Sequence, residues 1–255
     1  MPNTTIAQRI VRAKRTLSES GLAYETPRGE ALSERLSSVL EVVYLIFNEG
    51  YTAARGQDWL RPQLCNEALR MGRVLTAVAP HEREVHGLLA LMELNTSRTA
   101  ARTDAAGEPV LLLDQNRALW DQLQIRRGMQ ALGRAGELGG ARGIYAFQAA
   151  IVACHAQART ADDTDWSRIA GLYADLLAVV QSPIIELNHA VAVGMADGPE
   201  AALVIVDRLV HEPALKGYHL LPSVRGDLLH KLGRYDEARA AFEAAAGAGR
   251  QQART

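Results

Sequence analysis

Apolar residues recur at helical spacing along nearly the whole chain, and this periodicity limits the fold more than any other feature of the sequence. The clearest case starts at Leu32 and leads into six successive apolar residues, from Val42 to Phe47. Apolar positions three or four residues apart are typical of an amphipathic helix, and the closing run predicts a helix end that is buried on all sides. We expect Gly50 to stop this helix, because glycine adopts the left-handed C-cap conformation without a steric clash.

Asn48 and Glu49 are the two polar residues before this glycine. One interpretation places both in solvent near a helix end, where they carry no special role. The other makes them a pair that fixes the position of the segment that follows. The residue pattern by itself leaves both interpretations open.

Most other segments also show helical spacing, with proline, glycine or a capping residue at their ends. We expect helices over residues 27–50, 61–78, 81–103, 114–135, 144–160, 165–180, 184–195, 201–210, 220–232 and 236–246. No persuasive strand alternation occurs, and Val110–Leu113 is the one short strand candidate. The glycine-rich stretch Gly133–Gly143 is expected to be a loop between helices. The predicted fold class is all-α.

The last part of the chain resembles a tetratricopeptide repeat. Small residues that allow close helix approach alternate with large ones that fill the gap between helices, at Gly226, Leu229, Gly233, Tyr235, Ala238, Phe242 and Ala245. Pro222 departs from the pattern, because it stands where tryptophan is usual. A looser repeat covers residues 188–210. We therefore expect a multi-helical array that ends in tetratricopeptide-like helix pairs.

The composition is that of an ordinary globular protein. Of the 255 residues, 48% are apolar and 22% are charged. No run of about 18 uncharged apolar residues occurs, so we expect no membrane span, no signal peptide and a cytoplasmic location. Cys65 and Cys154 lie far apart in apolar helical contexts, which favours reduced core thiols over a disulfide or a metal site.

Positive charge is concentrated at the start of the chain. Residues 1–15 carry four basic residues and no acid, which leaves 24 basic against 29 acidic residues in the remainder. Thr5 and Gln8 form a capping box that opens an amphipathic basic helix ending near Gly21. A basic head on an acidic body points to a polyanion at one end and a different partner at the other.

Patterns of catalytic or ligand-binding residues are scarce. His81 and His86 are five residues apart rather than the four that place two zinc ligands on one helix face, and no phosphate-binding loop, dinucleotide fingerprint or nucleophile elbow occurs. The acidic cluster Asp162–Asp165 is interpreted as an N-cap for the next helix. Its spacing alone leaves a catalytic carboxylate pair open, which no other residue pattern supports. We expect no catalytic residues, no cofactor and no metal, and hence no enzyme.

Several sequence segments, in the order in which they occur along the chain, are similar to one protein family. The segment Pro2–Arg15 strongly resembles the recognition helix of region four in bacterial extracytoplasmic-function sigma factors, members of the sigma-70 family that direct RNA polymerase to promoters. Five later blocks look like the long C-terminal extension of one sigma-factor subgroup. They are Tyr44–Tyr51, Leu88–Met92, Asp114–Asp121, Asp163–Trp166 and Leu187–Val193.

This resemblance implies three parts: residues 1–25 as a remnant of the region-four recognition helix and its linker, residues 26–180 as a helical extension domain, and residues 181–255 as tetratricopeptide-like repeats. It implies that five residues face the promoter −35 element, namely Gln8, Arg9, Arg12, Lys14 and Arg15. Structural or regulatory roles are implied for seven residues of the later blocks, namely Asn48, Glu49, Asp114, Trp120, Asp165, Trp166 and Asn188.

The implied partners are RNA polymerase core and promoter DNA, through the full-length protein, and a protein partner in the repeat groove; no membrane is expected. Sigma region two would lie upstream of Met1, so we expect a fragment, or an assigned start too far downstream. Our first hypothesis is a noncatalytic regulatory extension of a sigma factor. The alternative is a free-standing helical-repeat adaptor, and an all-helical enzyme is disfavoured.

Overall fold

The structure is a computed structural model that describes residues 11–12, 15–16, 18–21, 30–51, 61–139 and 143–252, without the side chains of 30–34 and 250–252. Two compact units divide the chain, residues 1–42 and 43–255. The α-helices in the described residues are α2 (Glu30–Tyr51), α3 (Pro62–Val78), α4 (Arg83–Thr96), α5 (Gln122–Glu137), α6 (Ile144–Gln157), α7 (Trp166–Val179), α8 (Pro183–Ala196), α9 (Pro199–Leu209), α10 (Leu220–Lys231) and α11 (Tyr235–Gln252). The fold is all-α, as predicted. The described residues form no strand, and their isolated β-bridge joins Thr103 to Pro109.

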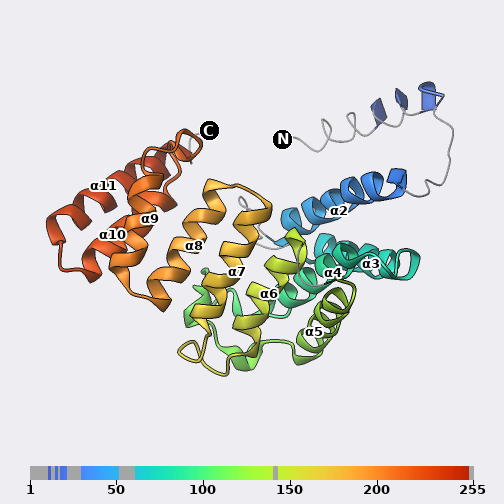
Figure 1. The fold of residues 1–255 in the computed structure, drawn as a ribbon, viewed down its shortest axis with the longest axis horizontal. Coiled ribbons are helices and arrows are strands. Elements are labelled where there is room, and N and C mark those ends of the chain that lie inside the picture. The colour runs from blue at the N-terminus through green and yellow to red at the C-terminus, as the bar shows by residue number, and fades with distance from the viewer. Residues whose placement is uncertain are drawn as a thin grey trace. The chain divides into compact units, whose positions relative to one another are not determined.

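The second unit is a succession of packed helices (Figure 1). α3 packs on α4, α4 packs on both α5 and α6, and from α6 to α11 each helix packs on the next. A helix that is apolar along one stripe must cover that stripe with a neighbour, and an array of helical pairs does so between successive elements.

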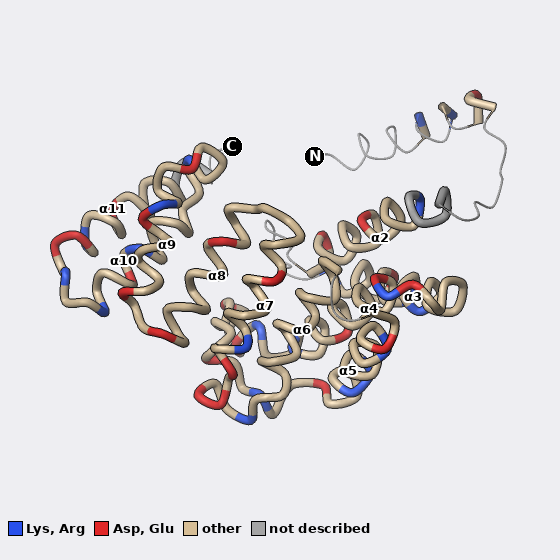
Figure 2. Tube along the Cα trace, in the orientation of Figure 1, with Lys and Arg blue, Asp and Glu red and all other residues tan. Residues whose placement is uncertain are grey.

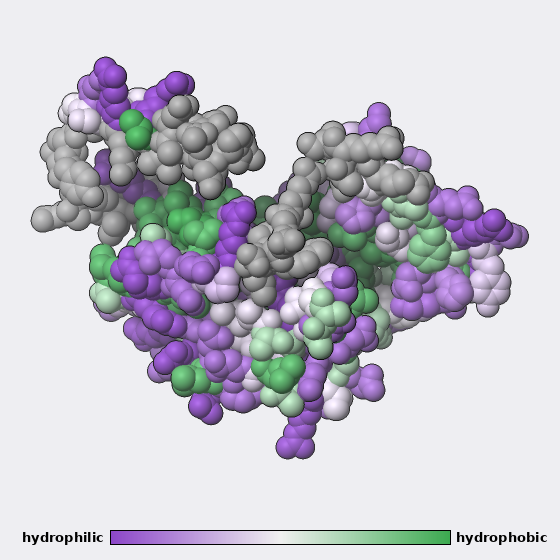
Figure 3. Space-filling model, turned by 180° about the vertical axis from the view of Figure 1, so that it is seen from behind, coloured by the Kyte–Doolittle hydropathy of each residue, from purple (hydrophilic) through white to green (hydrophobic). Residues whose placement is uncertain are grey.

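Among the described residues, groups of buried apolar side chains join successive helices of this array. The first joins α4, α5 and α6 and includes Leu94 and Trp120, the second joins α6, α7 and α8 around Ile169 and Leu176, and the third joins α8 to α11 around Val206. Basic and acidic residues are interspersed along the described helices (Figure 2), and the face seen in Figure 3 has apolar patches among polar side chains.

The C-terminal end of α2 is amphipathic, and the expectation of burial on all sides is wrong. Phe47 and Tyr51 are buried, and their rings stack with centroids 5.3 Å apart. Val42 and Leu45 are 55% and 58% exposed. The buried residues keep helical spacing to the last turn, so the core covers one stripe of the helix and leaves the other apolar residues in solvent.

Gly50 lies inside α2 and does not form the expected C-cap. Its φ is not positive, and the helix continues to Tyr51. A Cβ atom at Gly50 would lie 2.9 Å from both the backbone nitrogen and the Sγ of Cys65. The Arg61 N–H also donates a hydrogen bond to the Gly50 carbonyl at 2.8 Å. Glycine is needed here because α3 begins directly against the last turn of α2.

The predicted helix 81–103 ends early, at Thr96. The side chains of Asn95, Thr96 and Ser97 donate hydrogen bonds to backbone carbonyl oxygens three or four residues earlier, at 3.0, 2.7 and 2.7 Å. Such local bonds compete with helix continuation. A short 3-10 helix, η1 (Thr99–Ala101), follows instead.

The predicted helix 114–135 begins late, at Gln122. The Asp121 carboxylate caps α5 by accepting hydrogen bonds from the N–H groups two and three residues later, at 2.8 and 3.1 Å. Two 3-10 helices, η2 (Leu112–Asp114) and η3 (Arg117–Leu119), occupy the preceding residues. The helix start is therefore set by its cap, not by the first residue with suitable spacing.

The short strand candidate Val110–Leu113 forms no strand, and the expected loop from Gly133 is wrong. Residues 112–114 form η2, and α5 continues through Gly133 and Gly136. Ala131 and Ala135 are buried on the inner side of α5, whereas a Cβ atom at either glycine would meet nothing within 4 Å. Packing of the inner side outweighs the low helix propensity of the two glycines.

The helix pairs α8–α9 and α10–α11 have the close contacts that the repeat pattern predicts. A Cβ atom at Gly226 would lie 2.7 Å from the ring of Phe242. One at Gly194 would lie 3.0 Å from the Cβ of Ala202. Pro222 falls in the first turn of α10, where no intrahelical hydrogen bond is lost.

The two cysteines are free and buried, as expected. Burial raises the pKa of the Cys65 thiol and of the Cys154 thiol. A raised pKa keeps the thiol protonated, which suits a core side chain better than a nucleophile or a metal ligand.

Candidate interaction site

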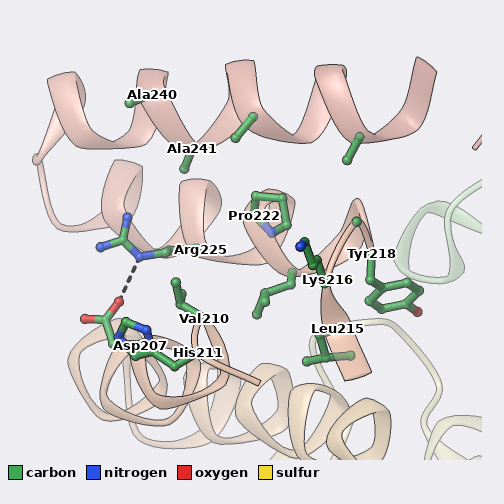
Figure 4. A pocket seen from close by; sticks show the side chains of 14 residues that line it. Asp207, Val210, His211, Leu215, Lys216, Tyr218, Pro222, Arg225, Ala240 and Ala241 are labelled. Atoms are coloured by element: carbon green, nitrogen blue, oxygen red, sulfur yellow. Dashed lines mark hydrogen bonds and ion pairs between the residues drawn. The ribbon is translucent and has the colours of Figure 1, made fainter. Parts of the chain in front are cut away.

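A groove of about 800 Å³ lies between α9 and α11, with α10 along its floor (Figure 4). Its residues come from α9, from the turn that follows, from α10 and from α11. They are Asp207, Val210, His211, Leu215, Lys216, Gly217, Tyr218, Leu221, Pro222, Arg225, Ala240, Ala241, Ala244 and Ala248. The groove is therefore a product of the two helix pairs and of the turn between them.

The turn after α9 brings several lining residues to one end of the groove. The Glu212 carboxylate accepts a hydrogen bond from the Ala214 N–H at 3.2 Å, which opens the 3-10 helix η4 (Pro213–Leu215). Gly217 has a φ of +81°, a conformation that glycine adopts without strain. This turn buries Leu215 and leaves Tyr218 half-buried.

One wall of the groove is made of alanines. Ala240, Ala244 and Ala248 follow one another at spacings of four along α11, so they share one face of that helix. Ala240 and Ala244 are exposed. Short side chains on this wall leave room for side chains of another molecule.

Charged groups occupy both ends of the groove. The Arg225 Nε donates to the Asp207 carboxylate at 2.8 Å, and this ion pair spans the groove from α10 to α9 (Figure 4). Lys216 and His211 are exposed. Among the lining residues Asp207 is the one acid, so with His211 neutral the lining has a formal net charge of +1.

The sequence-predicted DNA-binding residues are only partly described. Gln8, Arg9 and Lys14 lie outside the described residues. Arg12 and Arg15 are exposed, and the Arg15 Nε donates to the Glu19 carboxylate at 2.7 Å. The promoter contact of this segment stays a prediction.

Glu49 and Asn48 lie in the last turns of α2. The Glu49 carboxylate accepts a hydrogen bond from the Arg61 guanidinium at 2.6 Å, immediately before α3. Asn48 is half-buried. For Glu49, the geometry fits the interpretation of a contact to the following segment.

Trp120 and Trp166 pack against a polar centre, formed by Arg117 and His155, that the sequence did not predict. The Arg117 guanidinium lies 4.8 Å from the centroid of the Trp120 ring and donates to the carbonyls of His155 and Ala158. The His155 ring packs edge-on to Trp166 at 5.2 Å. Burial, aided by the positive charges of two arginines, lowers the pKa of His155 to about 4. This centre joins η3, α6 and α7, so its role is structural.

The remaining predicted residues do not gather in one site. Asp165 caps α7 by accepting a hydrogen bond from the Arg168 N–H at 2.9 Å, as expected for the acidic cluster. Asp114 ends η2 and is exposed, and Asn188 is exposed on α8. The predicted residues thus mark the junctions between helices, whereas the groove lies elsewhere.

A second cavity of about 700 Å³ lies between α3, α4 and α5, with Glu93 in its wall. The Glu93 side chain is only 2% exposed and is bound to Arg73. The nearby His86 ring nitrogen Nε2 lies 2.9 Å from the Pro80 carbonyl, and His81 is exposed. No cluster of three or more potential metal-binding side chains occurs in the described part of the chain.

None of the helices within the described ranges has both the length and the apolar character needed to cross a bilayer.

Sequence reasoning missed Arg117, His155 and the groove charges. Arg117 contacts residues 38 and 41 positions later in the chain, and local spacing carries no information about such partners. The alanines of the groove wall can be read from the sequence as small residues in the last repeat. Their exposure could not be predicted, because it depends on how α11 packs. The Asp207–Arg225 pair joins helices of different repeats and has no local signal.

Comparison with known proteins places the chain among uncharacterised relatives. Residues 35–136 match the model of a family of unknown function, DUF6596. The uncharacterized protein R00370 of Rhizobium meliloti (strain 1021) is 44% identical over 239 residues, which make up 93% of this chain and 56% of the relative. This chain therefore spans about half of the relative's length.

The fold also resembles a solved structure, the crystal structure of MamA. The two agree with a TM-score of 0.50 and 10% sequence identity, over 76% of this chain and 94% of MamA. At this level of identity the likeness concerns the fold alone.

Proposed function

We propose that this chain is a noncatalytic interaction module, the C-terminal regulatory extension of an extracytoplasmic-function sigma factor. The observation that carries the interaction role is the open groove between α9 and α11, built from two helix pairs. Helical repeats stack into extended surfaces that bind other proteins, and such surfaces need no catalytic groups.

The sigma-factor context rests on the ordered sequence resemblance. Several of its matched residues have packing roles in the second unit: Phe47 and Trp120 are buried, and Asp165 caps a helix. Matches at buried and helix-capping positions are what a shared fold produces, and other matched residues, such as Asp114 and Asn188, are exposed. The longer relative is compatible with this proposal, because about half of its length remains for other domains.

The mechanism follows from the architecture. The packed helices α9, α10 and α11 form the groove, so a partner bound there would be joined to the chain that also carries the basic segment, and through it to promoter DNA or polymerase. No group of the chain needs to react. Promoter contacts by Gln8, Arg9, Arg12, Lys14 and Arg15 belong to this proposal.

The test uses the full-length protein, including any upstream sigma regions encoded in frame. We expect deletion of residues 26–255 to change promoter-dependent transcription in a reconstituted polymerase assay. A second variant, Ala244→Trp, fills the groove without removing the domain, and Ala174→Trp on the exposed side of α7 is its control.

Polymerase association and transcription that stay unchanged in both the deletion and the Ala244→Trp variant would contradict a regulatory role. An absence of sigma regions in the upstream reading frame would favour the free-standing adaptor, which would use the same groove.

A further inference from the structure

The groove has the shape of a site for one more helix. α10 packs against both α9 and α11, so these two helices flank it and its free side forms the floor between them. Helices in such an array pack side by side, and an amphipathic helix lying along the groove would pack in the same way. With side chains, a helix is about 10 Å wide, and the short alanine side chains on α11 leave space for one.

The apolar side chains of the groove would contact an apolar stripe on the bound helix. Val210 is 49% exposed and Tyr218 is half-buried, while Leu215 and Leu221 form a buried layer beneath them. Covering such surface removes apolar area from water, which favours binding of an apolar face. Residues three or four apart on a bound helix would meet this surface along the groove.

The charges of the lining select an acidic helix. Asp207 is already neutralised by Arg225 at 2.8 Å, whereas within the described chain no ion pair to Lys216 is recorded. A carboxylate on the bound helix would pair with Lys216, and a basic helix would be repelled.

We propose that this groove binds an acidic amphipathic helix of a partner protein. The proposal rests on the role of the chain as an interaction module and adds the chemistry of its partner. The basic segment 5–15 of the same chain is the wrong occupant, because its arginines and lysine would face Lys216 and Arg225.

The test measures binding of two model peptides to the complete chain. Each peptide is labelled with fluorescein and has about 18 residues, with leucine at helical spacing. A peptide of this length can form a helix, although the helix has only marginal stability when the peptide is free. One peptide has glutamate at its polar positions and the other has lysine. Fluorescence anisotropy at about 0.15 M salt, where charge pairs beyond about 8 Å are screened, reports their affinities.

Five variants separate groove binding from general charge effects. Ala244→Trp fills the groove and Lys216→Glu reverses its free charge, whereas Lys216→Arg conserves that charge. Arg126→Glu on the exposed side of α5 and Ala174→Trp on α7 are matched controls. Thermal melts by circular dichroism identify variants that fail to fold, in which case Ala240→Leu replaces Ala244→Trp.

We expect the glutamate peptide to bind at least tenfold more tightly than the lysine peptide. Ala244→Trp and Lys216→Glu should each weaken its binding about tenfold, and Lys216→Arg and the two controls should leave it within about twofold. The proposal is overturned by equal or stronger binding of the lysine peptide, or by equal effects of groove and control variants.

The outcomes for the two proposals are separable. Loss of peptide binding with intact dependence of transcription on residues 26–255 would refute the acidic-helix partner alone. The opposite combination is tight binding of the glutamate peptide to this chain, together with transcription that is unchanged when residues 26–255 are deleted from the full-length protein. That result would refute the sigma-factor role alone.

Discussion

Arg73 donates two hydrogen bonds to one carboxylate oxygen of Glu93, at 3.2 and 2.7 Å, and so joins α3 to α4. The Glu93 side chain is 2% exposed, whereas that of Arg73 is 49% exposed. The partly exposed arginine therefore compensates a carboxylate that is almost wholly removed from water. Breaking such a pair costs more than the pair contributes, because one buried charge is left alone.

We predict that Arg73→Met destabilises the protein by about 3 kcal/mol. The double variant Arg73→Met with Glu93→Met should recover most of this loss, because no buried charge remains. Urea unfolding followed by circular dichroism measures both values. Arg70→Met is the control, since its pair with Glu67 is exposed and should contribute little. Equal losses for Arg73→Met and Arg70→Met would contradict the buried-charge explanation.

Gly87 lies at a close approach between α4 and α6. A Cβ atom there would lie 2.8 Å from the backbone nitrogen and 3.0 Å from the Cα of Ala146. Because backbone atoms cannot move aside alone, Gly87→Ala should cost about 1–3 kcal/mol. Gly136→Ala should stabilise α5 by up to about 1 kcal/mol, since nothing lies within 4 Å of its new Cβ. Thermal unfolding of both variants checks these opposite signs.

The last turn of α2 offers a comparison between a polar contact and a packing contact. Glu49→Gln should cost below about 1 kcal/mol, because Glu49 and Arg61 are 60% and 51% exposed. Gly50→Ala should cost about 1–3 kcal/mol, because its Cβ would press on the Cys65 backbone at 2.9 Å. A larger loss for Glu49→Gln than for Gly50→Ala would make the ion pair, rather than the close approach, the link to α3.

The sequence predicted well what depends on local pattern. Helical spacing identified the all-α fold, small residues identified the contact of Gly226 with Phe242, and the acidic cluster identified the cap at Asp165. Each of these features is set by residues within a few turns of one another.

Features that depend on competition or on distant partners could not be predicted. The side-chain bonds of Asn95 and Thr96 end α4 although apolar spacing continues, and Gly50 resembles a helix stop until α3 is placed against it. Arg117 and the groove pair Asp207–Arg225 bring together residues from different helices. Their chemistry appears only after the array has formed.

His155 should make the protein sensitive to mild acid. Its pKa in the folded chain is about 4, because burial and the charges of Arg98 and Arg117 disfavour the protonated ring, whereas its ordinary value is 6.5. Below pH 6.5 the unfolded chain takes up a proton that the folded chain refuses until about pH 4. Stability should therefore fall as the pH drops from 6.5 to 4, by up to about 3 kcal/mol, and then level off for this residue.

His155→Phe should remove this part of the pH dependence, because phenylalanine keeps a ring beside Trp166 and binds no proton. Free energies of unfolding at pH 7, 6, 5 and 4 measure the slope for both proteins. His81→Phe, at an exposed position, is the control and should keep the original slope. A slope that persists in His155→Phe would assign the acid sensitivity to the carboxylates instead. The test thus shows whether the polar centre around Arg117 depends on a neutral His155.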